Sequence, residues 1–440
     1  MKRTPFLLFY LLLTSHASFS QDDHRVTFNK YYLESLYKLN ALSGSKEAIS
    51  TCTADPQADY AGELEKIAGA WGRVADSLGF LFYSFSRDTL RCWLYRQEKF
   101  YFHQQPATEA DLLKLETDIR ASLKIDQLVA SRLPQPDGLK PGESSTSAVI
   151  PLARAVDRAS AVLFPPGIAE NIRGLSHLLV MAELNIGRIP FYLLRPFGDD
   201  TYLVDHCSVS FAPPICNTKE LKTKGSLLRG QKNRYAGSSA LVVGNPDYTK
   251  VYGYHFPALP GAATEAKNVS EILGTSPLTG NQATLSKVKE LAPGADLLYF
   301  ATHGLFNMET ALKGSFLVFT PDEQHNTGLW TALNIQYHPL DKTDLAVLSA
   351  CQTGVGKVYD GGFIGIGRTF YLAGVTNTVT TLWSVSDLAT EAIMTRFARN
   401  LLEPDFFYPS GHLRKAILAH RKKEDNPAHW APFMVFGITY

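Results

Sequence analysis

The sequence predicts an α/β fold in which a mostly parallel sheet carries helices on both faces, preceded by a smaller α+β half and a short helical N-terminal segment. From about residue 147, short apolar runs alternate with amphipathic stretches, as in parallel strands joined by crossover helices. Before that point, residues 79–104 hold three aromatic and β-branched runs broken by polar turns, which indicates antiparallel strands. A length of 440 residues, 45% of them hydrophobic, is enough for more than one structural unit.

The extreme N-terminus has the pattern of a secretory signal peptide over residues 1–20. Two basic residues precede an apolar run over 6–13, and the small residues Ser18 and Ser20 precede Gln21. The alternative is an N-terminal helix packed on the domain. The apolar run is too short to span a bilayer, and no other stretch has about 18 consecutive apolar residues. We therefore expect an exported protein, periplasmic or secreted, without a stable membrane span.

The remaining elements follow from hydrophobic spacing. Residues 21–74 have helical spacing and predict one or two helical hairpins, and helical spacing returns over 107–123 before a loop rich in Pro, Gly and Ser over 132–147. The second half predicts strands at 177–184, 239–248, 295–304, 343–354 and 376–387, a hairpin at 314–332, and helices at 148–164, 264–274, 284–294, 362–375, 388–403 and 410–425.

Two of these strands end in a reactive side chain followed by glycine. Leu298–Gly304 reads LYFATHG and ends in His303-Gly, whereas Val347–Gly354 reads VLSACQTG and carries Cys351 before its glycine. Functional residues of parallel sheets gather where strands end, so adjacent strands would bring the imidazole and the thiol into one cleft. A thiolate is the nucleophilic form of cysteine, and an imidazole can protonate the departing amine of a peptide.

The glycine after the histidine completes the predicted chemistry. The backbone N–H groups of Gly304 and Cys351 would form an oxyanion hole for the tetrahedral intermediate. In isolation, a cysteine that ends a strand is more often a small buried hydrophobe, and a histidine there is more often structural. The interval of about 50 residues between the two favours catalysis, since it is the His-to-Cys interval of caspase-type proteases.

Several sequence blocks resemble the CHAT domain family, a caspase-like and separase-like group of bacterial cysteine peptidase domains. The blocks are SALVVGNPDY, ADLLYFATHGLFN, TDLAVLSACQTGVG, GGFIGIGRTFYLAGVTNTVTTLWSVSD and HWAPFMVFG, in the family's order. The resemblance covers about 75–440 and implies a pseudo-caspase half over 75–235 and a caspase-like catalytic half over 236–440. It also implies that His303 and Cys351 form the catalytic dyad.

The resemblance further suggests a substrate-binding residue. Asp387 ends the strand expected after the nucleophile, and in separase-like relatives an acid near this point accepts a basic P1 side chain. A carboxylate there could pair with Arg or Lys. The alternative is that Asp387 caps the helix that starts at Leu388.

Other site classes find less support. Lys plus Arg (43) nearly balance Asp plus Glu (42), which leaves no electrostatic footprint for nucleic acid. The glycines at 362, 365 and 367 do not match a dinucleotide fingerprint and instead predict a helix packed closely on the sheet. His412, His420 and His429 form no metal-ligand set with a recognisable cysteine or acid spacing, and His429-Trp430 is expected to close the core. We therefore expect no cofactor and no metal.

The sequence thus predicts an exported cysteine endopeptidase acting on protein or peptide substrates. One alternative is a CHAT-fold binding or scaffold module that is catalytically silent or is activated by a protein partner. A weaker alternative makes Cys351 a redox-sensing thiol, although its segment holds no resolving cysteine. The pairing of the other cysteines, Cys52, Cys92, Cys207 and Cys216, is left open.

Overall fold

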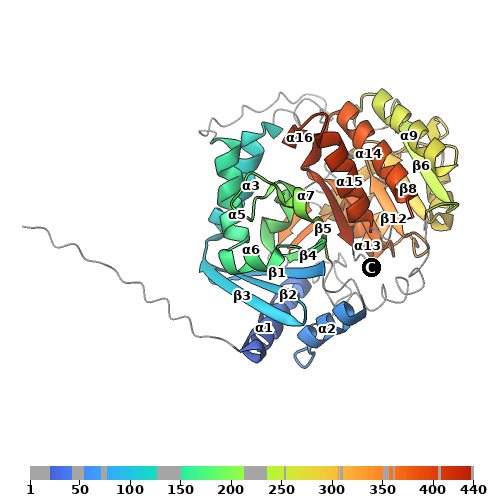
Figure 1. Ribbon diagram of the computed structural model, residues 1–440. Helices are drawn as coiled ribbons and strands as arrows, with labels where there is room; N and C mark the ends of the chain where they lie inside the picture. Colours follow the sequence, from blue (N-terminus) through green and yellow to red (C-terminus); the bar gives the residue numbers. More distant parts are fainter. Residues whose placement is uncertain are drawn as a thin grey trace, which may run out of the picture.

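The protein is built around one eleven-stranded sheet, seen in a computed structural model (Figure 1). The structure describes residues 20–41, 54–70, 77–125, 150–212, 235–251, 254–305, 307, 311–349, 356–359, 362–404 and 408–437. The first half of the chain, blue to green in Figure 1, lies beside the second half, yellow to red.

The elements of the first half are, in chain order, α1 (Gln21–Ala41), α2 (Tyr60–Ala70), β1 (Leu78–Ser86), β2 (Thr89–Arg96), β3 (Lys99–Pro106), α3 (Glu109–Ser122), α5 (Leu152–Leu163), α6 (Pro166–Ile172), β4 (His177–Ala182), η3 (Leu184–Arg188), η4 (Phe191–Leu193), α7 (Leu203–His206) and β5 (Ser208–Phe211). Those of the second half are β6 (Ala240–Pro246), α9 (Pro260–Leu273), β7 (Leu278–Gly280), α10 (Leu285–Leu291), η6 (Ala292–Gly294), β8 (Leu297–Ala301), β9 (Gly304–Leu305), α11 (Ala311–Gly314), β10 (Phe316–Val318), β11 (Leu329–Thr331), α12 (Ala332–Gln336), β12 (Leu345–Leu348), β13 (Gly356–Tyr359), β14 (Gly362–Gly365), α13 (Ile366–Leu372), β15 (Asn377–Thr381), α14 (Asp387–Leu401), α15 (Pro409–Arg421), α16 (Pro427–Trp430) and β16 (Phe433–Gly437).

The strand order in the sheet is β3-β2-β1-β4-β5-β16-β15-β12-β8-β6-β7. All neighbours are parallel except β3/β2, β2/β1 and β16/β15. The last strand, β16, joins the two halves, because it pairs with β15 along its whole length and Phe436 also pairs with Phe211 of β5. Since β16 runs against β15, the parallel block β1-β4-β5 points opposite to the block β15-β12-β8-β6-β7. The carboxyl ends of the two blocks therefore open at opposite edges of the sheet.

In the first half, alternate strand residues face different helices, as the two-residue period of a strand requires. Phe80 and Phe82 of β1 face one side and join an aromatic core with α1 and α2. Leu81 and Tyr83 face the other side, where α3, α5 and α6 cover them. Burying each such side chain contributes roughly 1.5–3 kcal/mol. The first two aromatic runs, β1 and β2, are therefore covered on both faces, whereas β3 at the edge of the sheet is largely half-buried or exposed.

The second half repeats this layering. On β8, Leu297 and Tyr299 face α9, α14 and α15, whereas Leu298 and Phe300 face α10, α12 and α13. Gly367 in α13 permits a close approach, because a Cβ there would lie 3.0 Å from Cγ2 of Thr380 on β15. The core that faces α9 continues without a break into the α3–α5 side of the first half.

The predicted fold class is confirmed: a large, mostly parallel sheet flanked by helices, with an antiparallel β1-β2-β3 meander in the first half. One element was predicted wrongly, because the helix expected over 362–375 begins only at Ile366. Residues 362–365 form β14 in a hairpin with β13, since two glycines bracket the apolar pair at 363–364 and favour an extended strand over a helix. The predicted domain boundaries stay a prediction.

The N-terminal helical segment forms two helices that contact each other and the sheet. Arg25 of α1 pairs with Asp59 and with Glu65 of α2, and the α1 face carrying Phe28 and Tyr32 is buried. Among the described residues, no helix combines the length and the apolar character that crossing a membrane requires.

Candidate active site

His303 lies two residues beyond the end of β8, and its backbone is held from both sides. The carbonyl of His303 accepts a hydrogen bond from Val318 N (2.9 Å). The preceding Thr302 donates its hydroxyl to the carbonyl of Val318 and lies 3.0 Å from the hydroxyl of Tyr248. The loop after β8 is therefore fixed against β10, which determines where the imidazole sits.

The ring of His303 is buried, with only 5% of its surface exposed. Its Nε2 donates a hydrogen bond to the carbonyl of Pro257 (2.8 Å), and the rings of Tyr248 and Phe256 lie 4.8 and 5.1 Å from it. A carbonyl can only accept, so Nε2 carries the hydrogen and the lone pair of the neutral ring is on Nδ1. Burial lowers the pKa of His303, against the hydrogen bond to Pro257 and the negative charge of Asp387, so the neutral base is favoured.

Cys351, the predicted nucleophile, lies outside the described residues. The strand that leads to it is described: β12 runs parallel to β8, and Leu348 pairs with Phe300. Cys351 follows Leu348 by three residues, as His303 follows Phe300. The predicted adjacency of the two strands is present. Gly304, the predicted oxyanion-hole donor, is the first residue of β9 and pairs with Leu317 of β10.

A small pocket opens at the ends of these strands. Its residues come from the carboxyl ends of β8, β12 and β15 and from the starts of α9 and α14: Leu259, Gly261, Ala262, Glu265, Thr302, Ser349, Thr381, Val385, Asp387 and Thr390. Two of them lie close to the predicted dyad in sequence, since Thr302 precedes His303 directly and Ser349 precedes Cys351 by two residues. The pocket thus lies beside the predicted reaction centre.

Asp387 is the first residue of α14 and lines this pocket. The alternative that it caps the helix is wrong, because Ser386 is the N-cap and its side chain accepts from Ala389 N (3.2 Å). Gly261 lets α9 approach Asp387, since a Cβ on Gly261 would lie 2.7 Å from the Cβ of Asp387. The carboxylate therefore sits between the first turns of two helices, whose positive ends stabilise an anion.

Glu265 of α9 is a second acid in the pocket, which the sequence analysis missed. It is 3% exposed and accepts a hydrogen bond from the hydroxyl of Tyr299 (2.7 Å). Burial raises the pKa of Glu265 to about 7, opposed by the Tyr299 hydrogen bond and assisted by the nearby acids Glu391 and Asp387. Helical spacing could have indicated that Glu265 is a buried acid, because it lies one turn before Val269 on the apolar face of α9.

Two further predictions concern the histidines and the tryptophan near the C-terminus. Trp430 closes the core as expected and is fully buried, but His429 beside it keeps 22% of its side chain exposed. The expected absence of a metal site stays a prediction, but the sequence spacing did not reveal that His420 and His429 converge on Glu424. Their spacing, His-x₃-Glu-x₄-His, depends on a turn after α15 that the sequence pattern did not reveal.

Cys92 and Cys207 are buried free thiols. Burial raises the pKa of Cys207 to about 12 and that of Cys92 further, so both stay protonated and unreactive.

The CHAT domain family matches residues 153–438 of the chain. The chain belongs to the CHAT domain family. Its fold is accordingly caspase-like.

Tetratricopeptide repeat protein 28 of Homo sapiens is 26% identical over 302 residues, which cover 59% of this CHAT-domain chain and 12% of that protein. The Mus musculus protein of the same name is 25% identical over 303 residues, with the same coverage. The chain therefore spans a small part of these relatives.

Among solved structures, the Saccharomyces cerevisiae separase–securin complex matches with a TM-score of 0.56 at 11% identity, over 95% of this chain and 34% of that one. At this identity the likeness shows a shared fold.

Proposed function

We propose that this CHAT-domain protein is an exported cysteine endopeptidase that cleaves protein substrates after basic residues. The observation that carries the proposal is His303: a buried imidazole at the carboxyl end of β8, with Nε2 held by Pro257 and the lone pair on Nδ1. His303 follows Phe300 of β8 by three residues, and Phe300 pairs with Leu348, which precedes Cys351 by three.

In the proposed reaction, the Cys351 thiolate attacks the scissile carbonyl carbon while His303 carries the proton. The negative charge that develops on the carbonyl oxygen is stabilised by the backbone N–H groups of Gly304 and Cys351. His303 then protonates the departing amine, and the C–N bond breaks to leave an acyl-enzyme thioester. His303 next takes a proton from water, which attacks the thioester and releases the new carboxylate and the thiol.

The acidic pocket supports a preference for Arg or Lys at P1. Asp387 and Glu265 supply two carboxylates in one small cavity beside the strand ends. A bound guanidinium or ammonium would neutralise them, and its positive charge would favour ionisation of Glu265, whose pKa is near 7 in the free protein.

A second candidate, a form that needs a protein partner before it acts, is favoured by the burial of His303. Only 5% of its surface is exposed, with Tyr248 and Phe256 against the ring. Substrate access to Nδ1 would then depend on displacement of neighbouring loops. The separase neighbour was solved as a complex with securin, and a partner of this chain would act at that access step.

The test uses purified protein from Gln21 onward together with its Cys351→Ala, Asp387→Asn and Asp111→Asn variants. Fluorogenic peptides covering all P1 residues and an acyloxymethyl-ketone probe with Arg at P1 report turnover and labelling. We expect both signals to vanish in Cys351→Ala. Asp387→Asn is expected to lower kcat/KM about 10²-fold for Arg and Lys only, because a desolvated charge pair is lost.

Asp111→Asn is the matched control, since Asp111 is also an acid in the first turn of a helix, α3 of the first half. It should leave every P1 rate unchanged. If the wild type neither cleaves nor labels, the protein is not active by itself, and the partner-dependent candidate is tested next by adding extracts of the source cells.

Export is proposed from the signal-peptide pattern. Gln21, the residue expected after cleavage, is the first residue of α1, and its side chain accepts from Phe100 N (2.7 Å) and donates to Phe100 O (3.1 Å) at β3. Cleavage before Gln21 would leave this pair intact. N-terminal sequencing of protein recovered from periplasm and medium tests it: an intact Met1 in the cytoplasm would refute export.

A further inference from the structure

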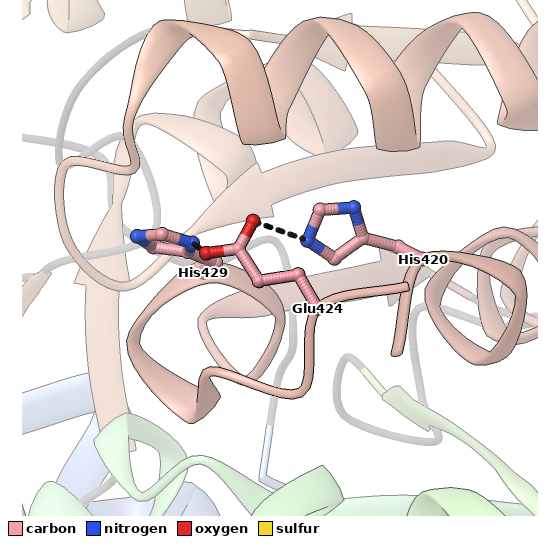
Figure 2. A group of neighbouring side chains, drawn as sticks. All are labelled: His420, Glu424 and His429. Carbon is pink, nitrogen blue, oxygen red and sulfur yellow. Dashed lines mark ion pairs between the residues drawn. The ribbon is translucent and has the colours of Figure 1, made fainter. Parts of the chain in front are cut away.

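Two histidines and a glutamate far from the predicted dyad in sequence converge at the end of α15 (Figure 2). His420 is in the last turn of α15, Glu424 lies in the turn that follows, and His429 is in α16. One nitrogen or oxygen from each lies within 4.8 Å of the others. Figure 2 shows the Glu424 carboxylate between the two imidazole rings.

The backbone holds this arrangement in place. Glu424 N donates to His420 O (3.0 Å), which continues helical geometry one turn past α15 and puts both side chains on one face. The third residue is fixed by α16, where Asn426 is the N-cap and His429 N donates to Asn426 O (2.9 Å). The three side chains therefore meet without rearrangement of the chain.

The two facing nitrogens are buried and lack hydrogen bonds among the described residues. His420 has 9% of its side chain exposed; its Nε2 is fully buried and lies 4.0 Å from Glu424 Oε2. Nδ1 of His429 is also buried and lies 3.0 Å from Glu424 Oε1, in a geometry that does not satisfy a hydrogen bond. Each nitrogen thus faces the Glu424 carboxylate without a hydrogen bond. Buried polar atoms that make no hydrogen bond are costly, so a ligand that both nitrogens could bind would stabilise this turn.

A second layer of contacts supports the turn from behind. Asp425 Oδ1 accepts from Arg421 Nε (2.9 Å) and from the indole N–H of Trp430 (2.9 Å). Trp430 is fully buried, and Arg421 also pairs with Asp205 of the first half. Because Asp425 is held on both sides, the converging side chains of His420, Glu424 and His429 are preorganised.

We propose that His420, Glu424 and His429 bind a divalent transition-metal ion, for which zinc is the best match. Two imidazoles and one carboxylate are a common zinc ligand set that leaves a fourth position for water. Each imidazole faces a different oxygen of Glu424, and the separations of 3.0 Å from His429 and 4.0 Å from His420 bracket the spacing between ligand atoms around a tetrahedral ion with bonds of about 2.1 Å.

An ion can reach the site and is favoured there. Glu424 is half-exposed, and a pocket between α9, α14 and α15 reaches His420. The site also lies at the carboxyl end of α15, where the helix dipole favours a cation. With the ion on Nδ1 of His429, its Nε2 would carry the hydrogen, and the long contact of Asn426 Nδ2 to Nε2 (3.4 Å) would be released.

The site is connected to the candidate pocket. The carbonyl of Ala428 in α16 accepts a hydrogen bond from the indole N–H of Trp383 (2.9 Å), a fully buried residue just beyond β15. Asp387 lies four residues further along the same segment. Metal binding would therefore stiffen the support of the segment that carries Asp387.

The test titrates zinc alone into the full-length protein after treatment with a chelator, in competition with a chromophoric zinc indicator. All variants are made in a Cys351→Ala background, so that the predicted dyad cannot supply a thiolate ligand. We expect one tight equivalent in the background protein and at least about tenfold weaker binding in Glu424→Gln and in His429→Gln. His255→Gln, which removes an exposed histidine outside the cluster, should bind as the background does.

Thermal denaturation supplies the second measurement. Zinc should raise the Tm of the background protein and leave that of Glu424→Gln unchanged, while the two have similar Tm values in chelator, because Glu424 is exposed. The proposal is overturned if the background protein binds no zinc. It is also overturned if binding is equal in all variants.

Discussion

β4 and β8 each end next to a buried ionisable residue, Glu183 in the first half and His303 in the second, and the two residues are used differently. Glu183 is 2% exposed, and its carboxylate accepts from Phe85 N (2.8 Å), from Lys38 of α1 (3.2 Å) and from the hydroxyl of Ser35. The contacts of Glu183 with Ser35 and Lys38 attach α1 to the sheet.

His303 is almost as buried, but its ring has one hydrogen-bond partner among the described residues, Pro257. Its second nitrogen keeps a lone pair at the edge where the acidic pocket opens. The two residues also lie at opposite edges of the sheet, because the two parallel blocks run in opposite directions. Burial and a position near a strand end are therefore common to both residues, and they differ in the nitrogen of His303 that makes no hydrogen bond among the described residues.

The largest expected effect concerns this difference directly. His303→Ala should lower kcat/KM on a P1-Arg peptide about 10³-fold, because it removes the proposed proton carrier of both half-reactions. Glu183→Ala should leave kcat/KM per folded molecule unchanged. Equal losses of activity in the two variants would mean that His303, like Glu183, affects activity only through the structure.

The second prediction reverses the order of the two variants. Glu183→Ala should lower the free energy of unfolding in urea by about 4 kcal/mol, since it leaves Lys38, Ser35 and Phe85 N without their common acceptor. His303→Ala removes one hydrogen bond to Pro257 and should cost about 1 kcal/mol. A stability loss from Glu183→Ala as small as that from His303→Ala would show that α1 is held by its apolar face alone.

The layering of the sheet could be predicted from sequence because it follows from local patterns. Alternation of apolar residues assigns Phe80 and Leu81 to opposite faces, and the apolar run at 297–301 predicts a fully buried strand. His303 could be singled out because a reactive residue at the end of such a strand is unusual. The equal offset from Phe300 and Leu348 then needed only strand adjacency.

What could not be predicted depends on contacts between distant segments. Glu265 becomes a pocket residue because α9 approaches α14 at Gly261, 126 positions before Asp387 along the chain. The convergence of His420 with His429 depends on a turn held by Asp425, Arg421 and Trp430. The assignment of the cap to Asp387 missed by one residue, since Ser386 is as good a cap by residue type.

The third prediction compares Glu265 with Glu183, whose carboxylate accepts three hydrogen bonds. The pKa of Glu265 rises on folding from its ordinary value of 4.5 to about 7, so folding favours the protonated form. The contribution of protonated Glu265 to the free energy of unfolding is therefore fully present below about pH 4.5. It is lost as the pH rises to about 7, which lowers the free energy of unfolding by about 3 kcal/mol. Glu265→Gln, which keeps an acceptor for Tyr299, should lack this loss.

Urea denaturation of both proteins across that pH range measures it. The difference in unfolding free energy between Glu265→Gln and the wild type should grow with pH and level off above about pH 7. Glu271→Gln, on the exposed side of the same helix, is the control and should parallel the wild type. A pH-independent difference would place the ionised carboxylate of Glu265 in a solvated pocket, as open as a surface site.

The smallest expected effect comes from removing one helix N-cap in each half of the chain. Ser386→Ala removes the N-cap of α14 and Thr108→Ala removes that of α3, and each should cost about 1 kcal/mol of stability. Only Ser386 adjoins Asp387, so only Ser386→Ala should also reduce the preference for Arg over a neutral P1 residue, by a few-fold, because the first turn of α14 frays. Equal unfolding midpoints combined with different P1 ratios would support this assignment. An unchanged P1 ratio in Ser386→Ala would mean that Gly261 and α9, and not the cap, hold the Asp387 carboxylate in the pocket.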